Sequence, residues 1–223
     1  MAKKRDDELF GIIGLGRFGL ALTQTLAELG KDILVVDNNE AKIRHAAQFT
    51  DNAFTVGTLN QDALQEVGIR NCDTVIVCIG EAVDVSILTT LNVIQMGVKR
   101  VLAKAINAEH GMVLEKLGAE VIYPEREMAV RVAKHLAMPN MMEYITLGGN
   151  VEISEIRLTE RLEGATVVGS NLRGRFGINI VTLAHDGNII TEIQPNLTLH
   201  EGDMIVVVGK HESIRKFEEF LGE

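Results

Sequence analysis

Three glycines near the start of the chain have the spacing Gly-x-Gly-x-x-Gly, within the segment GLGRFG at residues 14–19. Glycine suits each position for a different reason. Gly14 permits a tight turn, Gly16 lets a phosphate approach the backbone, and Gly19 lets a helix pack closely on a strand. A helix that begins at this turn aims free N–H groups and a partial positive charge at an anion. The segment therefore predicts a phosphate-binding turn.

An acidic residue at the end of the next apolar run strengthens this prediction. Residues 32–37, DILVVD, read as a buried strand, and Asp37 at its end lies about 20 residues beyond Gly16. A carboxylate at that point can accept hydrogen bonds from both ribose hydroxyls and repels a 2′-phosphate. Motif, context and spacing together predict a site for an adenosine nucleotide.

Arg17 stands inside the glycine turn, on the first turn of the expected helix, where it would face the phosphates. Backbone N–H groups hold the diphosphate of NAD adequately, whereas the γ-phosphate of ATP calls for one more cation. We therefore expect Arg17 to distinguish ATP from ADP. The alternative is an exposed arginine near a helix start, which is mildly unfavourable beside the helix dipole.

Groups for catalysis on the nucleotide are not evident. An NAD-dependent oxidoreductase needs a proton donor, but the residues four places after Tyr123 and Tyr144 are Glu127 and Gly148, so no Tyr-x-x-x-Lys pair exists. The histidines show no metal-binding spacing with one another or with a cysteine. We expect a protein that binds the nucleotide and is not an enzyme, with a small NAD-dependent oxidoreductase as the alternative.

The amino-acid composition excludes some classes of binding partner and indicates a cellular compartment. The net charge of −9 argues against nucleic acid as a main partner, because binding to phosphate backbones needs an excess of Lys and Arg. No apolar run approaches the length of a membrane span, so direct membrane insertion is not expected. Cys72 and Cys78 flank one expected strand and make no disulfide framework, which indicates a reducing, cytoplasmic compartment.

Short apolar runs alternate with helical stretches over the first half of the chain. We expect strands at residues 9–14, 32–37, 53–57, 73–80, 100–105 and 120–124. Runs that are apolar on both faces and joined by helices belong to a parallel sheet covered on both sides. The predicted fold class is α/β, a Rossmann-type doubly wound parallel sheet followed by a second lobe.

After residue 150, apolar and polar residues alternate over shorter segments. A small, mainly β (α+β) C-terminal lobe is expected, with strands at residues 151–158, 179–185, 188–193 and 204–209 and a closing helix at 212–221. The predicted domains are residues 1–137, a nucleotide-binding Rossmann lobe, and residues 151–223. Residues 138–150, which are rich in methionine, are expected to form a linker or crossover.

Several segments, in this order, resemble the RCK-domain (TrkA-N/TrkA-C) family of regulators of potassium conductance. They read FGIIGLGRFG, DILVVDNNEAKI, GIRNCDTVIVCIG, SILTTL, LAKAIN and LEKLGAEVIYPEREMA. The resemblance covers essentially the whole chain, and GLGRFG and YPEREMA are its most specific parts. Within the family it is strongest to the KtrA- or KtrC-like cytosolic gating subunits of Ktr potassium transporters.

The resemblance implies a regulatory function. In such proteins the Rossmann lobe binds ATP or ADP, dimers assemble into an octameric ring, and the nucleotide changes the shape of the ring. The ring then gates a Trk- or Ktr-type potassium-transporter subunit in the membrane, which places the homo-oligomer on the inner face of the cell membrane through that partner. Trk-like relatives bind NAD(H), so NAD(H) is the alternative ligand.

Roles for single residues follow from the resemblance. Lys104 matches a lysine that reaches the phosphates, and Glu125 matches an acid that helps hold Mg²⁺ or another cation near the γ-phosphate. The expected cofactor-binding positions are Gly14, Gly16, Arg17, Phe18, Gly19, Asp37, Asn39, Gly57, Thr58, Ile79, Gly80, Lys104 and Glu125. Leu59 stands where the family commonly has threonine, so only Gly57 and Thr58 of that segment are expected to line the pocket.

A second ligand is also implied. Several relatives bind cyclic di-AMP at a two-fold interface between their C-terminal lobes, and a symmetric ligand suits such an interface. The matching positions in this chain are Arg173, Asn179, Ile180 and Pro195. An apolar dimer interface without a ligand is an equally good interpretation of this segment.

Overall fold

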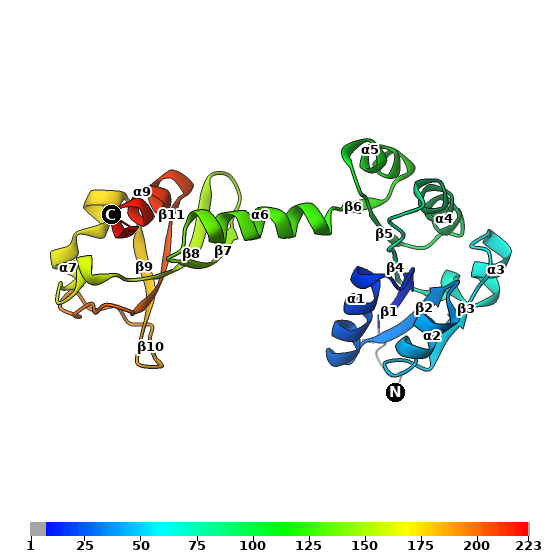
Figure 1. Cartoon of the computed structure of the whole chain (residues 1–223), viewed down its shortest axis with the longest axis horizontal. Coiled ribbons are helices and arrows are strands. Elements are labelled where there is room, and N and C mark those ends of the chain that lie inside the picture. Colours follow the sequence, from blue (N-terminus) through cyan, green and yellow to red (C-terminus); the bar gives the residue numbers. More distant parts are fainter. Residues whose placement is uncertain (1–7, 223) are drawn as a thin grey trace, which may run out of the picture. The chain divides into compact units, whose positions relative to one another are not determined.

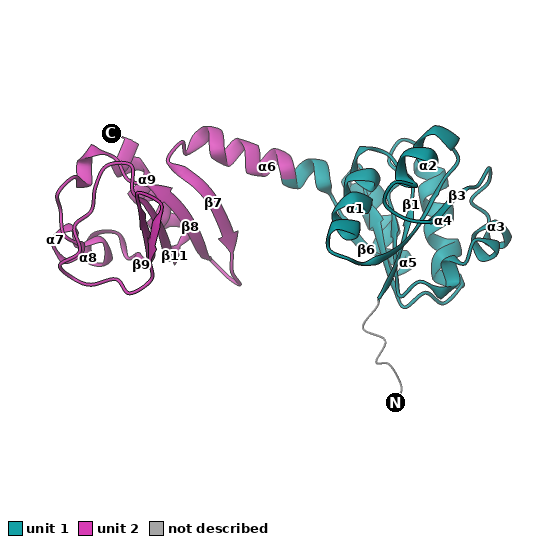
Figure 2. Cartoon of the chain, turned by 90° about the horizontal axis from the view of Figure 1, so that it is seen from below, with its two compact units in different colours: residues 1–127 teal, residues 128–223 magenta. Residues whose placement is uncertain are grey.

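The computed structural model describes residues 8–222, with the element order drawn in Figure 1. Contacts within the chain divide it into two units, residues 1–127 and residues 128–223, which Figure 2 colours separately. Each unit has its own sheet and its own hydrophobic core. Across residues 8–222 the helices are all too short or too polar to cross a membrane.

A six-stranded parallel sheet with the order β3-β2-β1-β4-β5-β6 forms the centre of the first unit. Its strands are β1 (Leu9–Ile13), β2 (Asp32–Asp37), β3 (Asn52–Thr55), β4 (Thr74–Val77), β5 (Arg100–Lys104) and β6 (Glu120–Ile122). The helices are α1 (Arg17–Glu28), α2 (Glu40–Ala46), α3 (Gln61–Glu66), α4 (Val83–Gln95) and α5 (Ala108–Leu117), with a 3-10 turn η1 (Ile69–Asn71) before β4. The prediction of a Rossmann-type sheet is confirmed.

Alternate side chains of the central strands enter two separate cores, one on each face of the sheet. Ile12 and Ile76 belong to one core, whereas their chain neighbours Ile13 and Val77 belong to the other. All four side chains are at most 4% exposed, and each burial contributes about 1.5–3 kcal/mol. Helices therefore cover both faces of the sheet. Because β1 and β4 are parallel neighbours, the connections that follow them leave the sheet at the same edge.

A five-stranded antiparallel sheet with the order β10-β9-β11-β8-β7 forms the second unit. Its strands are β7 (Met141–Thr146), β8 (Val151–Arg157), β9 (Asn179–His185), β10 (Asn188–Ile190) and β11 (Met204–Lys210). The helices are α7 (Val167–Ser170), α8 (Leu172–Phe176) and α9 (His211–Gly222), with a 3-10 turn η2 (Glu160–Leu162). Phe217 of α9 packs in the core with Leu183 and Ile205, and all three are nearly or fully buried. The mainly β lobe is as predicted.

The segment 138–150, expected to be a linker or crossover, contains strand β7. Helix α6 (Pro124–Ala137) precedes it, and the division between the two units falls within this helix. Met141 is 2% exposed in the core of the second unit. The pairing of β7 with β8 shifts register between Met141 and Glu143, so the strict alternation that marks a strand in a sequence is interrupted.

Candidate nucleotide-binding site

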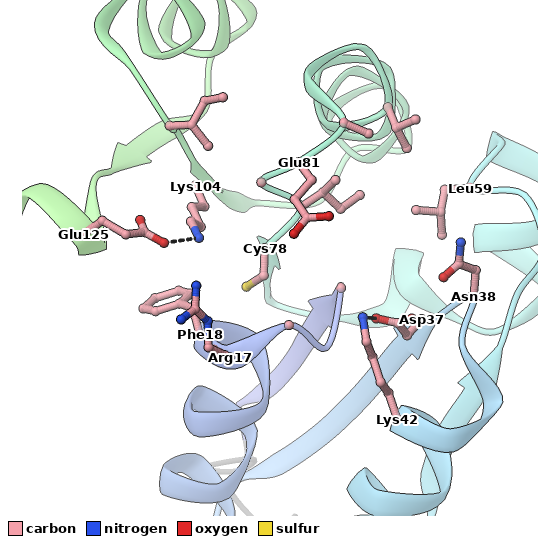
Figure 3. Close-up of a pocket in the computed structure, with 17 residues that line it drawn as sticks. Arg17, Phe18, Asp37, Asn38, Lys42, Leu59, Cys78, Glu81, Lys104 and Glu125 are labelled. Atoms are coloured by element: carbon pink, nitrogen blue, oxygen red, sulfur yellow. Dashed lines mark hydrogen bonds and ion pairs between the residues drawn. The ribbon is translucent and has the colours of Figure 1, made fainter.

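A cavity of about 610 Å³ lies in the first unit, at the carboxyl ends of β1 and β4. The sheet reverses its winding between these two strands, and doubly wound sheets bind ligands at this switch point. Figure 3 shows the side chains around it. The lining consists of Gly14, Gly16, Arg17, Phe18, Asp37, Asn38, Lys42, Leu59, Cys78, Ile79, Gly80, Glu81, Ala82, Val85, Lys104, Ile106 and Glu125.

The glycine turn forms the floor of the cavity, and each glycine has a structural reason. Gly14 has a φ of +97°, which side chains rarely adopt. A Cβ on Gly19 would stand 2.0 Å from the carbonyl oxygen of Gly14, so only glycine lets α1 begin this close to the turn. A Cβ on Gly16 would meet nothing within 4 Å, which leaves open space above the backbone. The N–H groups of the first turn of α1, which have no partner within the helix, are available to an anion there.

The Asp37 carboxylate is held in place by the backbone. Its Oδ2 accepts a hydrogen bond from the N–H of Leu15 at 2.6 Å, and its Oδ1 accepts one from the N–H of Asn39 at 2.8 Å. The Lys42 ammonium lies 3.5 Å from Oδ2. Each carboxylate oxygen can accept further hydrogen bonds, so Asp37 can still receive the hydroxyls of a sugar.

Arg17 brings a positive charge to the cavity from the first turn of α1 (Figure 3). Within residues 8–222 its guanidinium has no hydrogen-bond or ion-pair partner, and the residue is exposed. A cation at a helix N-terminus is opposed by the helix dipole, so an anion bound nearby would offset the cost of this placement.

Lys104, at the end of β5, and Glu125, in the first turn of α6, form an ion pair on one wall of the cavity (Figure 3). The Lys104 side chain is 12% exposed, whereas that of Glu125 is 64% exposed. The hydrogen bond from Lys104 is the main cause that holds the pKa of Glu125 below its usual value, and the charge of Arg17 adds to it. A phosphate that binds Lys104 must therefore compete with an ionised carboxylate.

Most of the predicted positions line this cavity, and the exceptions are Gly19, Asn39, Gly57 and Thr58. Gly19 is buried where α1 packs on the turn. The Asn39 side chain caps α2 instead, because its Oδ1 accepts a hydrogen bond from the N–H of Ala41 at 2.9 Å. Leu59, which was not expected to contribute, lines the cavity in place of Gly57 and Thr58.

Sequence reasoning also missed lining residues from the turns and helix starts that follow three strands. They are Asn38 and Lys42 after β2, Cys78, Glu81, Ala82 and Val85 after β4, and Ile106 after β5. The available signal was position, since each belongs to the turn or the first helical turn that follows a parallel strand. Cys78 adds bulk without charge, because burial raises the pKa of its thiol to about 12.

A separate cavity of about 350 Å³ lies in the second unit. Arg173, Asn179, Ile180 and Pro195, the positions expected for a second ligand, all line it. The rest of the lining is mostly aliphatic, with Val167 and Ile193 as examples. The four residues come from α8, β9 and the loop before β11, so the fold brings together positions that are distant in the sequence.

Comparison with known proteins agrees with this geometry. Residues 10–124 match the TrkA-N domain, and residues 151–222 match the TrkA-C domain. Over 94% of its length the chain is 35% identical to Ktr system potassium uptake proteins C and A of Bacillus subtilis, and it covers 95% of each. A crystal structure of the GsuK RCK domain shares the fold at 21% identity, with a TM-score of 0.53 over 99% of this chain, which spans 48% of the GsuK chain. The chain therefore belongs to the TrkA-N/TrkA-C, or RCK-domain, family, as its sequence resemblance predicts.

Proposed function

We propose that this chain is the cytoplasmic regulatory subunit of a Ktr-type potassium uptake system and that the cavity of the first unit binds ATP and ADP. The relatives named Ktr system potassium uptake protein support the first part, because they align along nearly the whole chain. The observation that carries the second part is the set of phosphate-directed groups on one side of the cavity. Those groups are the N-terminus of α1, Arg17 and Lys104.

The cationic, polar and apolar groups of the cavity follow the same order as the phosphates, ribose and base of a nucleoside polyphosphate. Figure 3 shows Arg17 and Lys104 on one side and Asp37, Asn38 and Leu59 on the other. Phosphates would lie over the glycine turn beside the two cations, where the helix N-terminus adds N–H donors. The ribose would meet Asp37, while Leu59 offers apolar surface to the base. Arg17 is the group that a γ-phosphate engages and that a diphosphate does not need.

The lining suits binding better than catalysis. Among the lining residues described there is no histidine, serine or tyrosine, and the Cys78 thiol stays protonated at neutral pH. The charged lining residues Asp37 and Glu125 are held by backbone N–H groups and by Lys104, whereas nucleophilic catalysis would require a nucleophile beside an activating base. We therefore infer that the nucleotide is bound as a regulatory ligand and is not chemically altered, and that the protein is not an enzyme.

A divalent cation is part of the proposal. No three or more His, Cys, Asp or Glu side chains within residues 8–222 are grouped to hold a metal on their own. Mg²⁺, however, commonly takes one or two carboxylates together with phosphate oxygens and water. Glu125, once phosphates have replaced it on Lys104, fits the role of that carboxylate.

Assembly and the second ligand follow from family membership. We infer that copies of this chain pair and form a ring, with eight copies as the expected number, and that the ring contacts a membrane subunit that conducts potassium. A ligand can shift such a ring only by binding its two shapes with different affinity. The cavity around Arg173 and Asn179 is the proposed site for cyclic di-AMP, whose two-fold symmetry suits an interface between two copies.

NAD(H) is the alternative ligand. Asp37 would hold the adenosine ribose of NAD(H) as well as that of ATP. The cationic side chains Arg17 and Lys104 favour the nucleotide with more phosphate charge. A titration that compares the two ligands separates these possibilities.

Rescue of potassium-limited growth tests the proposed function. The host is a Bacillus subtilis strain that lacks its Ktr proteins A and C and keeps its membrane subunits. We expect this chain to restore growth at low potassium and the Asp37→Ala variant, expressed at the same level, to fail. Arg44→Ala is the matched control, because Arg44 pairs with Glu40 on the exposed face of α2.

Two results would count against the proposal. Absence of rescue, in a strain that Ktr protein C does rescue, would refute the potassium function. Full rescue by Asp37→Ala would separate the potassium function from the nucleotide cavity.

A further inference from the structure

The second unit contains a cavity that neither proposed ligand explains. It has a volume of about 450 Å³ and shares no residue with the cavity around Arg173. His185, at the end of β9, and His200, in the loop before β11, both line it. Gln194 and Asn196 add amide groups to the same lining.

Both imidazoles are oriented by carboxylates. His185 Nδ1 lies 2.6 Å from Asp203 Oδ1, and His200 Nδ1 lies 3.0 Å from Glu163 Oε1. Asp203 is 3% exposed and also accepts a hydrogen bond from the N–H of His200 at 2.8 Å. A carboxylate can only accept, so in each neutral ring the proton sits on Nδ1 and the lone pair sits on Nε2. Histidines that bind metals are held in this way by a carboxylate or carbonyl.

The two rings lie close together on the lining of this cavity. Their centroids are 4.9 Å apart and their planes are inclined by 40°. Two imidazoles that bind one tetrahedral ion through bonds of about 2.0–2.1 Å place their centroids about 5 Å apart. The observed separation of the centroids is compatible with one shared ion, which both rings can bind when their Nε2 atoms face it.

The charge around the cavity favours a cation. Glu163, Asp203 and Asp186 surround the two rings, and Asp186 Oδ2 lies 3.6 Å from His185 Nε2. The lining that the structure describes contains no lysine or arginine. Imidazole nitrogen suits Zn²⁺, Cu²⁺ and Ni²⁺, whereas Mg²⁺ and Ca²⁺ prefer oxygen ligands.

We propose that His185 and His200 bind one transition-metal ion of the Zn²⁺ class through their Nε2 atoms, with Asp203 and Glu163 as positioning residues. Water completes the coordination, since no third ligating side chain of the described residues joins the group. The site is open, and the ion is held less tightly than in a closed site with four protein ligands.

Titration of the metal-stripped full chain with Zn²⁺, in the absence of nucleotide, tests this proposal. We expect one Zn²⁺ per chain, no competition from excess Mg²⁺, and at least a tenfold loss of affinity in His185→Ala and in His200→Ala. His45→Ala is the matched control, because His45 is an exposed histidine on α2. Equal binding by the His185 and His200 variants and the wild type would overturn the site, as would displacement by Mg²⁺.

Nitrogen-15 spectra of the histidine rings give a second measurement that does not depend on affinity. We expect Zn²⁺ to shift the Nε2 signals of His185 and His200 and to leave those of His45 unchanged. The Glu163→Gln variant should keep the fold and weaken binding about tenfold or more, because the orienting charge is lost. Zn²⁺ bonded to Nδ1 in place of Nε2, or equal shifts at all histidines, would mean adventitious surface binding. Because nucleotide is absent throughout, neither outcome bears on the proposed potassium function.

Discussion

Arg17 and Lys104 each bring one positive charge to the cavity of the first unit, but they differ in burial and in existing partners. Lys104 is largely buried and already paired with Glu125. Arg17 is exposed and, within residues 8–222, has no such partner. An added phosphate can therefore engage Arg17 without breaking an existing contact. This difference makes Arg17 the better candidate for a group that responds to one additional phosphate.

The Arg17→Ala variant should weaken ATP binding more than ADP binding. Hydrogen bonds to charged groups contribute about 1.5–3 kcal/mol, so the ATP affinity should fall about tenfold or more while that of ADP changes less. Calorimetric titration of nucleotide-stripped protein measures both. Arg44→Ala removes the same charge from the exposed face of α2 and should change neither. An equal loss for ATP and ADP in Arg17→Ala would refute the γ-phosphate role.

Alanine substitutions at Gly16 and Gly19 should affect different properties, namely nucleotide binding at Gly16 and protein stability at Gly19. An alanine at Gly19 would place Cβ 2.0 Å from the Gly14 carbonyl, and overpacking of this kind costs about 1–3 kcal/mol. An alanine at Gly16 meets nothing within 4 Å, so it should leave stability unchanged and weaken nucleotide binding by blocking the phosphate. Urea unfolding and nucleotide titration of both variants measure the two effects. A stable Gly19→Ala variant would contradict the close packing of α1 on the turn.

The elements that carry the cavity could be predicted because their signals are strong and local. Strands buried on both faces read as continuous apolar runs, and the glycine turn with Asp37 fixed the place of the site. Strand β7 could not be predicted, because a register shift after Met141 interrupts its alternation. Leu59 was missed because its place in the cavity depends on how the segment after β3 folds back, which no local spacing records.

Helix α9 is joined to the start of β7 by one buried carboxylate. Glu218 is 5% exposed, and its Oε1 accepts hydrogen bonds from the N–H groups of Asn140 and Met141 at 2.9 and 3.1 Å. Its other oxygen is buried without a partner in the described part of the chain. Burial raises the pKa of Glu218, and the two backbone hydrogen bonds oppose this only in part.

Stability should therefore depend on pH through Glu218. The folded-state pKa lies above the unfolded one, so the favourable contribution is full below about pH 4.5 and is lost as the pH rises through the folded-state pKa. The free energy of unfolding of the wild type, relative to Glu218→Gln, should fall as the pH rises from about 4.5. Denaturant unfolding across this range measures it. Glu219→Gln, which changes an exposed residue paired with Arg215, is the control. A constant or rising difference for Glu218→Gln would contradict the prediction.

At the scale of the whole molecule, the chain consists of two units with separate cores. Phe217, Ile205 and Leu183 belong to the core of the second unit, while the nucleotide cavity is lined only by residues of the first. A ligand stabilises the part of the protein that binds it and that unfolds with its site. Nucleotide should therefore act on the stability of one unit.

Hydrogen exchange should detect this selectivity. At a free nucleotide concentration 100 times the Kd, the first unit should gain about 2.7 kcal/mol, so its most protected amides should exchange about 100-fold more slowly. Amides of residues 128–222 should change little. Apo protein and protein with ADP, compared by mass spectrometry, provide the measurement. Protection confined to the second unit, or equal in both, would contradict the placement of the site.

Calorimetric titration of nucleotide-stripped wild-type protein with ATP, ADP, NADH and AMP, with and without Mg²⁺, tests the proposed ligand most directly. We expect ATP and ADP to bind in the micromolar range or more tightly and NADH to bind clearly more weakly, because Arg17 and Lys104 face the phosphate end of the cavity. Preferred binding of NADH would leave the fold unchanged. It would contradict the assignment of this cavity to ATP and ADP and would return Arg17 to an ordinary residue at the start of a helix.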